Sequence, residues 1–263
     1  MSTEAVGKIE WRAPLSIAIG DASLAVAQNR PAGGSGSNGL RSPSALGLII
    51  KRLAWPLKKL HDDLLVDGYI EREIGALIHQ YCRPAETYLD IGCGDMSVRR
   101  FVPKGFIYNA LDIELSEFHA RRVLAEGDRV NIIVASATHI PAETASASLI
   151  LSTETFTFID DITAALRELH RVAAPQARLI CSISNEKCRK YEMKGPNPLT
   201  QHKWSCKEFA DLMAEHGFAL IEARQKGYWL PIPRWLTSIS YQLPFTSRQE
   251  RDNTNFFYVF EKR

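Results

Sequence analysis

The sequence has few cysteines, little net charge and no long apolar run, and each shortage excludes a class of protein. The five cysteines of this 263-residue chain are odd in number and scattered, which argues against a disulfide framework and favours a reducing compartment. A formal net charge of +2 provides no basic stripe of the kind that nucleic-acid-binding domains carry. We therefore expect a protein that binds no nucleic acid. The chain also shows neither an apolar stretch of membrane-spanning length nor a signal-peptide pattern, so we expect it to be cytoplasmic.

A metal site is not expected either. Cys188 and Cys206 stand on either side of His202, which is the arrangement closest to a set of metal ligands. The chain has no C-x-x-C pair, however, and this spacing matches no common zinc pattern. We therefore predict no metal cofactor.

The composition changes along the chain and divides it into three parts. Residues 29–44 are rich in Gly, Ser and Pro, and we expect residues 1–44 to form a flexible extension and linker. In residues 45–85 apolar side chains recur at steps of three and four, which predicts two helices broken near Pro56 or at the Asp67-Gly68 step. We expect these helices to form a lid over the site. The alternative is that their basic stretch lies on a membrane surface.

Residues 86–263 alternate short apolar runs with helical patterns, which is typical of a mostly parallel sheet with helices on both faces. Seven strands are expected, in the segments TYLDIG, IYNALDI, RVNIIVAS, ASLILSTE, ARLICSIS, FALIEARQ and NFFYVFEK. The last two segments have no convincing helix between them, which favours an antiparallel last strand.

The stretch YLDIGCGD places two glycines directly after an apolar strand. Gly92 and Gly94 leave the backbone bare, so that its N–H groups can approach a ligand. Asp112 lies twenty positions after Gly92, at the end of the next strand. A right-handed strand–helix–strand unit places this carboxylate beside the first loop, where it can accept hydrogen bonds from both ribose hydroxyls. The pattern predicts a nucleoside cofactor.

Two nucleoside cofactors suit this geometry. A dinucleotide would want a third glycine at the position of Ser97. S-adenosylmethionine (SAM) has no phosphate and does not need that turn, and Asp90 would be available near its methionine end.

These motifs resemble those of class I SAM-dependent methyltransferases. YLDIGCGD is similar to motif I of the family and IYNALDIE to its acidic second-strand motif, and the resemblance extends over about residues 86–263. The subgroup that the chain most resembles acts on glycans or small metabolites. The resemblance implies a Rossmann-like α/β fold and SAM as cofactor. It also implies a set of binding residues: Asp90, Gly92, Cys93 and Gly94 around the methionine moiety, Asp112 on the ribose, Ile113 against the adenine, and Ser136 and Ala137 in the loop at the adenine amino group.

Several positions depart from the family pattern. Ser136 replaces an Asp, Met96 the third glycine of motif I, Ser148 an acid before the fourth strand, and Gln176-Ala177 a Gly-Gly turn. These departures leave open a scaffold protein that has lost catalysis. A nicotinamide-dependent oxidoreductase is a further alternative, although the chain lacks a Tyr-x-x-x-Lys pair after the fourth strand.

Methyl transfer is an in-line displacement, so the protein must align the reactants and take a proton from a hydroxyl acceptor. The candidate catalytic bases are His202, in a loop after the fifth strand, and Glu154, at the end of the fourth. The alternatives are a loop histidine packed on Trp204 and a glutamate that caps the next helix. No Asn-Pro-Pro-Tyr tetrad follows the fourth strand, which argues against methylation of nucleic-acid bases. We expect O-methylation of a sugar or a small metabolite.

Overall fold

The computed structural model describes residues 68–83, 87–103, 106–114, 130–195, 197–229 and 242–263. The predicted extension, residues 1–44, and the first lid helix lie outside these ranges. The strands are β1 (Tyr88–Ile91), β2 (Tyr108–Asp112), β3 (Val130–Val134), β4 (Ala147–Thr153), β5 (Ala173–Ser184), β6 (Phe218–Trp229), β7 (Gln242–Leu243) and β8 (Asn253–Lys262). The helices are α2 (Tyr69–Tyr81), α4 (Ile162–Val172), α5 (Arg189–Lys194) and α6 (Cys206–Glu215), with short 3₁₀ helices η2 (Ser97–Phe101), η3 (Phe156–Phe158) and η5 (Glu250–Asp252).

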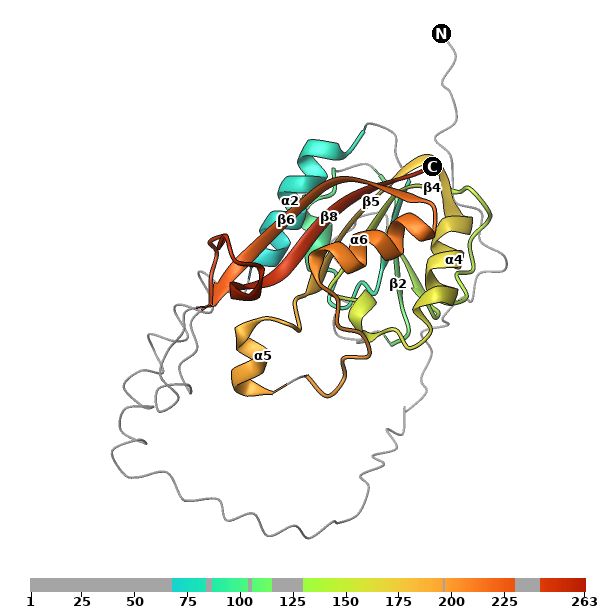
Figure 1. Cartoon of the computed structure of the whole chain (residues 1–263). Helices are drawn as coiled ribbons and strands as arrows, with labels where there is room; N and C mark the ends of the chain where they lie inside the picture. Colours follow the sequence, from blue (N-terminus) through green and yellow to red (C-terminus); the bar gives the residue numbers. More distant parts are fainter. Residues whose placement is uncertain (1–67, 84–86, 104–105, 115–129, 196, 230–241) are drawn as a thin grey trace, which may run out of the picture.

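One sheet forms the centre of the described part (Figure 1), with the strand order β3-β2-β1-β4-β5-β8-β6-β7. The strands from β3 to β5 run parallel to their neighbours, whereas β8 pairs antiparallel with both β5 and β6. Each of the seven long strands overlaps a predicted segment, but β5 begins four residues before its segment, at Ala173, and β6 ends four residues after its segment, at Trp229. The last strand is antiparallel as expected. The sequence pattern did not predict β7, because two residues at the sheet edge are too short to show a period.

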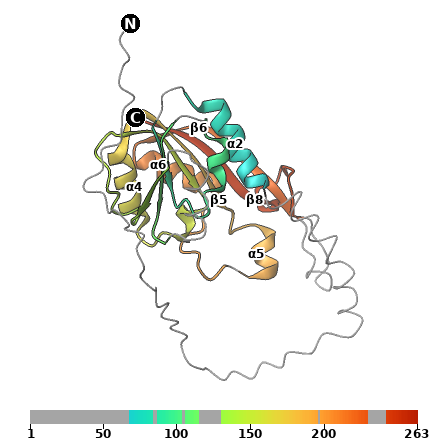
Figure 2. The same cartoon turned by 180° about the vertical axis from the view of Figure 1, so that it is seen from behind.

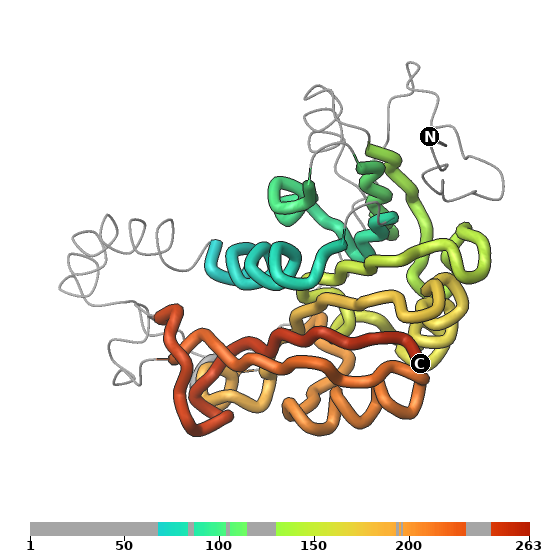
Figure 3. Tube along the Cα trace, turned by 90° about the horizontal axis from the view of Figure 1, so that it is seen from above, coloured from blue at the N-terminus to red at the C-terminus, as the bar shows by residue number. Residues whose placement is uncertain are grey.

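Helices cover both faces of the sheet, as Figures 2 and 3 show from behind and from above. Ile74 and Leu77 of α2 are buried in one core, and Leu166 of α4 and Phe209 and Met213 of α6 in the other. The central strands are therefore enclosed on both sides, and β1 is buried at all four positions. This enclosure explains why these strands appear in the sequence as near-continuous apolar runs.

Helices α4 and α6 each begin at a residue whose side chain caps the helix. The Asp161 side chain accepts a hydrogen bond from the Ala164 N–H at 2.9 Å and caps α4. Ser205 and Glu208 form a reciprocal capping box at α6. Helix α2 begins after Gly68, at the predicted break, and has no side-chain cap.

Charged side chains hold α2 against strand β6. Glu73 forms ion pairs with Arg224, at 3.6 Å, and with Lys226 of β6. About two turns further on, the Tyr81 hydroxyl donates to Glu222 at 2.6 Å. The helix is thus fixed by these contacts as well as by its apolar face.

The strand order reverses at β1, since β2 and β3 lie on one side of it and β4 and β5 on the other. The carboxyl ends of β1 and β4 therefore flank the topological switch point of the sheet, the position at which open α/β sheets bind their ligands.

Candidate functional site

The glycine loop after β1 is tied to the end of β2 by hydrogen bonds. The N–H groups of Gly92 and Cys93 both donate to the Leu111 carbonyl, at 2.8 and 3.1 Å. The Gly94 N–H donates to the Asp112 carboxylate at 2.9 Å. The loop and the acidic strand end, which the sequence predicted to lie together, are therefore in direct contact.

The two glycines of this loop differ in what surrounds them. Both have left-handed φ angles, 69° at Gly92 and 50° at Gly94. A Cβ atom at Gly94 would meet nothing within 4 Å, so this residue faces open space. A Cβ atom at Gly92 would lie 2.1 Å from the Thr155 hydroxyl oxygen. Gly92 therefore allows the loop that follows β4 to pack against the loop that follows β1.

Alanine substitutions at the two glycines should have unequal costs. Gly94→Ala should lower the free energy of unfolding by about 1 kcal/mol, the cost of a left-handed alanine. Gly92→Ala has the same backbone cost and adds an overlap with Thr155, so we expect a loss of about 3 kcal/mol or more. Denaturant unfolding of both variants measures the difference, and equal losses would contradict the packing described.

Asp112 and Ile113 form a combined polar and apolar surface at the end of β2. The second carboxylate oxygen of Asp112 accepts a hydrogen bond from the Glu114 N–H at 3.3 Å, and the residue remains partly exposed. Ile113 is 71% exposed. A single exposed isoleucine is ordinary on a protein surface. Ile113 lies beside a carboxylate that a ribose could reach, and it offers an apolar contact for an adenine ring. Asp112 and Ile113 therefore fit the adenosine part of SAM.

Asp90, near the end of β1, and Cys93, within the glycine loop, are both buried. Asp90 is 1% exposed, accepts a hydrogen bond from the Tyr108 hydroxyl through Oδ2, and has no partner for Oδ1 among the described residues. Burial raises the pKa of Asp90 to about 7, helped by the charges of Asp112 and Asp95 and opposed by the Tyr108 hydrogen bond. Burial also raises the pKa of the Cys93 thiol, so this residue is not a reactive thiolate.

The loop after β3 lies against the same strand end. The Ala135 N–H donates to the Asp112 carbonyl at 2.9 Å. Ser136 bonds through its hydroxyl to Thr138 within the loop, at 2.8 Å, and Ala137 is buried. The structure therefore brings the three predicted cofactor loops, after β1, β2 and β3, to one edge of the sheet.

The departures from the family motif occupy defined structural positions. Met96 adopts φ 58° and Gln176 φ 62°, the left-handed conformation that glycine takes without cost. Met96 is also buried in the core beneath α2. Ser148 accepts a hydrogen bond from the Thr87 N–H at 2.7 Å, which links the starts of β4 and β1.

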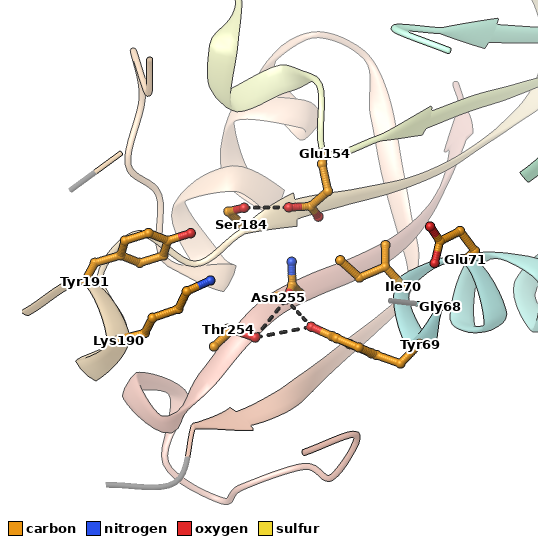
Figure 4. A pocket seen from close by; sticks show the side chains of 10 residues that line it. All are labelled: Gly68, Tyr69, Ile70, Glu71, Glu154, Ser184, Lys190, Tyr191, Thr254 and Asn255. Atoms are coloured by element: carbon orange, nitrogen blue, oxygen red, sulfur yellow. Dashed lines mark hydrogen bonds between the residues drawn. The ribbon is translucent and has the colours of Figure 1, made fainter. Parts of the chain in front are cut away.

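A cavity of about 230 Å³ lies at the carboxyl ends of β4 and β5 (Figure 4). Its lining comes from five places in the chain: Gly68, Tyr69, Ile70 and Glu71 at the start of α2, Glu154 after β4, Ser184 at the end of β5, Lys190 and Tyr191 of α5, and Thr254 and Asn255 at the start of β8. Glu154 directly precedes Thr155, whose side chain contacts Gly92. The pocket therefore adjoins the glycine loop.

Glu154 is the acidic group at the inner wall of this pocket. Its Oε2 atom accepts a hydrogen bond from the Ser184 hydroxyl at 2.5 Å, while the buried Oε1 atom has no hydrogen-bond partner in the described part of the chain. Burial raises the pKa of Glu154, and hydrogen bonds from nearby groups and the charge of Lys190 oppose the rise. The backbone at Glu154 is left-handed, with φ 57°, a strain often retained at functional sites. A buried carboxyl group with one free oxygen is suited to accept a proton.

His202 lies elsewhere. Its Nε2 atom donates to the Ile159 carbonyl at 2.8 Å, and its ring stacks on Trp204 with centroids 4.8 Å apart. It is not among the residues that line the pocket. The structure thus shows the packing on Trp204 that was the alternative to a catalytic role, and it does not bring His202 and Glu154 together.

Sequence reasoning missed the pocket residues Tyr69, Lys190 and Asn255. They belong to α2, α5 and β8, which are far apart in the chain and carry no motif. The only signal was the general expectation that a lid helix and the loop after the fifth strand would lie over the carboxyl edge of the sheet.

No group of three or more His, Cys, Asp or Glu side chains within the described residues is placed to hold a metal ion. None of the helices among residues 68–263 that the structure describes is long and apolar enough to cross a membrane.

The fold is shared by solved structures of low sequence identity. The 1,6-didemethyltoxoflavin-N1-methyltransferase of Burkholderia thailandensis, solved with 1,6-didemethyltoxoflavin and S-adenosylhomocysteine, is 16% identical over 85% of this chain and 92% of its own, with a TM-score of 0.55. A SAM-dependent methyltransferase of Methanosarcina mazei is 19% identical over 71% and 96%, with a TM-score of 0.52. The [4+2]-cyclase SpnF is 13% identical over 73% and 80%, with a TM-score of 0.55. The fold is therefore that of the Rossmann-like methyltransferases.

The sequence itself supports the same class. Residues 89–181, from β1 into β5, match the family model described as a methyltransferase domain. The sequence matches no curated protein. The family match over residues 89–181 and the shared fold together confirm the predicted resemblance to class I SAM-dependent methyltransferases, a class whose cofactor is SAM.

Proposed function

We propose that the protein transfers the methyl group of SAM to a hydroxyl group of a small polar acceptor. The observation that carries this proposal is the contact between Gly92 and Thr155, which places the Glu154 pocket next to the glycine loop. The solved Burkholderia methyltransferase contains a small-molecule substrate, which supports an acceptor of this size.

The predicted residues divide the cofactor between them in this proposal. Asp112 accepts hydrogen bonds from the ribose hydroxyls, and Ile113 covers one face of the adenine. The backbone of Gly92, Cys93 and Gly94 borders the methionine moiety, with Asp90 beneath it. The loop of Ser136 and Ala137 borders the adenine edge.

The protein contributes alignment and a proton acceptor. When bound, SAM supplies a methyl group on a sulfonium sulfur, which keeps the C–S electron pair as a thioether when the O–CH₃ bond forms. Glu154 takes the hydroxyl proton through its free oxygen Oε1, and Ser184 fixes the carboxylate through Oε2. Glu154 carries the base role alone here, because His202 bonds to Ile159 away from the pocket.

The proposal is tested by methyl transfer from isotopically labelled SAM to matched hydroxyl and amino compounds of monosaccharide size. An O-methylated product, located by NMR, would support it. Methylation of amines alone would overturn the choice of a hydroxyl acceptor. Cofactor binding without transfer to any acceptor would favour the scaffold, or a different reaction on this fold, as the cyclase neighbour exemplifies.

A further inference from the structure

A buried tyrosine that belongs to no motif bonds to the acid of the strand before the glycine loop. Tyr108 of β2 pairs in register with Tyr88 of β1, two residues before Asp90, so all three side chains lie on one face of the sheet. Across this diagonal the Tyr108 hydroxyl donates a hydrogen bond to Oδ2 of Asp90. Tyr108 is 2% exposed and Asp90 1%, so both partners of this bond are shielded from solvent.

The other carboxylate oxygen of Asp90, Oδ1, is buried and accepts no hydrogen bond within the described ranges. A buried acceptor without a donor costs free energy, so this oxygen is suited to a donor that a ligand brings. In the binding mode proposed above, the methionine end of SAM lies at the glycine loop and carries an α-ammonium group. This ammonium is a donor of the required charge.

The surroundings of Asp90 oppose its ionisation. Burial raises the pKa of Asp90 most, and the charges of Asp112, at the end of β2, and Asp95, in the loop, raise it further. The hydrogen bond from Tyr108 lowers this pKa. The Tyr108 hydroxyl therefore favours the charged form that an ammonium needs.

The neighbouring elements leave this hydroxyl as a permanent donor. Burial and the Asp90 charge hold the pKa of Tyr108 well above its ordinary value, although Arg99 of η2 opposes the rise. Burial likewise raises the pKa of the Cys93 thiol in the loop, which stays neutral. Helix α2 covers this face of the sheet, and its Glu73 forms ion pairs with β6 instead.

We propose that Tyr108 is a positioning residue for the cofactor, whose hydroxyl holds the Asp90 carboxylate so that Oδ1 meets the α-ammonium of SAM. Tyr108 acts through Asp90 and does not touch the ligand. It thereby favours ligands that carry the amino-acid portion, because an adenosine thioether without that portion gains nothing from the carboxylate. This inference rests on the proposed function, since it uses the placement of the methionine moiety at the glycine loop.

Calorimetric titration of the full chain and of its Tyr108→Phe variant with two ligands tests the inference. S-adenosylhomocysteine carries the amino-acid portion, whereas 5′-methylthioadenosine keeps the adenosine and the thioether but lacks it. At neutral pH, Tyr108→Phe should bind S-adenosylhomocysteine about tenfold more weakly, since a charge-assisted contact is weakened. Its affinity for 5′-methylthioadenosine should change by no more than about twofold. Asp90→Asn should show the same selective loss.

The pH dependence of binding separates positioning from packing and needs only S-adenosylhomocysteine. Binding to the wild-type chain should strengthen as pH rises through about 7, where Asp90 loses its proton. Tyr108→Phe removes the bond that lowers the pKa of Asp90, so the rise should move to higher pH. In Asp90→Asn the rise should be absent.

Tyr88→Phe is the matched control. It removes a buried hydroxyl from the paired position in β1, where that hydroxyl contacts Cys82 Sγ at 2.5 Å, and it should leave the binding of both ligands unchanged. An equal loss of both ligands in folded Tyr108→Phe, a loss of neither, or an unshifted pH profile would overturn the inference while the proposed function stands. Failure of the wild-type chain to bind S-adenosylhomocysteine would overturn the proposed function and this inference with it.

Discussion

Glu154→Gln is expected to lower the rate of methyl transfer about 10²- to 10³-fold, within the range of general-base catalysis. The amide keeps the size of the side chain and can still accept a hydrogen bond from Ser184, but it cannot take a proton. Because Glu154 faces the acceptor pocket, the affinity for SAM should change by no more than about twofold. Steady-state kinetics and calorimetric titration measure the two effects separately.

The pH dependence of the rate provides a second readout of the same residue. Burial raises the pKa of Glu154, so the base form should appear, and the rate rise, at a higher pH than for an ordinary glutamate. Ser184→Ala removes a hydrogen bond that lowers this pKa, and the rise should move further up in pH. Glu143→Gln, at an exposed glutamate, should leave the profile unchanged. Full activity of Glu154→Gln would contradict the base role.

Between pH 4 and pH 7, Asp90→Asn should raise the free energy of unfolding relative to that of the wild-type chain by about 3–4 kcal/mol. The carboxyl group has a pKa of about 7 in the folded chain against an ordinary value of 3.8, about three units at ~1.4 kcal/mol each. Between these two values the folded state keeps a proton that the unfolded state has lost, so this group makes the free energy of unfolding fall as pH rises. Asparagine does not titrate and can still accept the hydrogen bond from Tyr108. The free energy of unfolding of the variant should therefore rise relative to that of the wild-type chain as pH increases from 4 to 7.

Denaturant unfolding at several pH values from 4 to 7 measures the difference in free energy of unfolding between the wild-type and Asp90→Asn chains. Asp160→Asn makes the same chemical change at an exposed site and should show no comparable trend. A difference between wild-type and Asp90→Asn chains that stays constant with pH would show that Asp90 titrates as an ordinary aspartate.

The sequence predicted the fold and the cofactor loops because both depend on local patterns. The long strands are enclosed on both faces, so each appears as an apolar run. Gly94 and Asp112 belong to one strand–loop–strand unit, whose geometry fixes their contact. Neither feature requires knowledge of distant segments.

The acceptor pocket could not be predicted in the same way. Tyr69 and Asn255 are 186 positions apart and meet because β8 inserts antiparallel beside β5 while α2 packs over that face. His202 shows that a suitable residue type does not by itself predict a catalytic role. A histidine in a loop suggests a base, but its partners, Ile159 and Trp204, are known only once the chain has folded.

Calorimetric titration of the full chain with SAM and S-adenosylhomocysteine tests the central claim most directly. We predict micromolar binding of both compounds at one site per chain, with Glu114→Ala, beside Asp112, as the control that binds normally. Asp112→Ala should weaken binding at least about 100-fold, because the ribose loses two hydrogen bonds to a charged group at about 1.5–3 kcal/mol each. Absence of binding to the wild-type chain, or undiminished binding to a folded Asp112→Ala variant, would contradict the account.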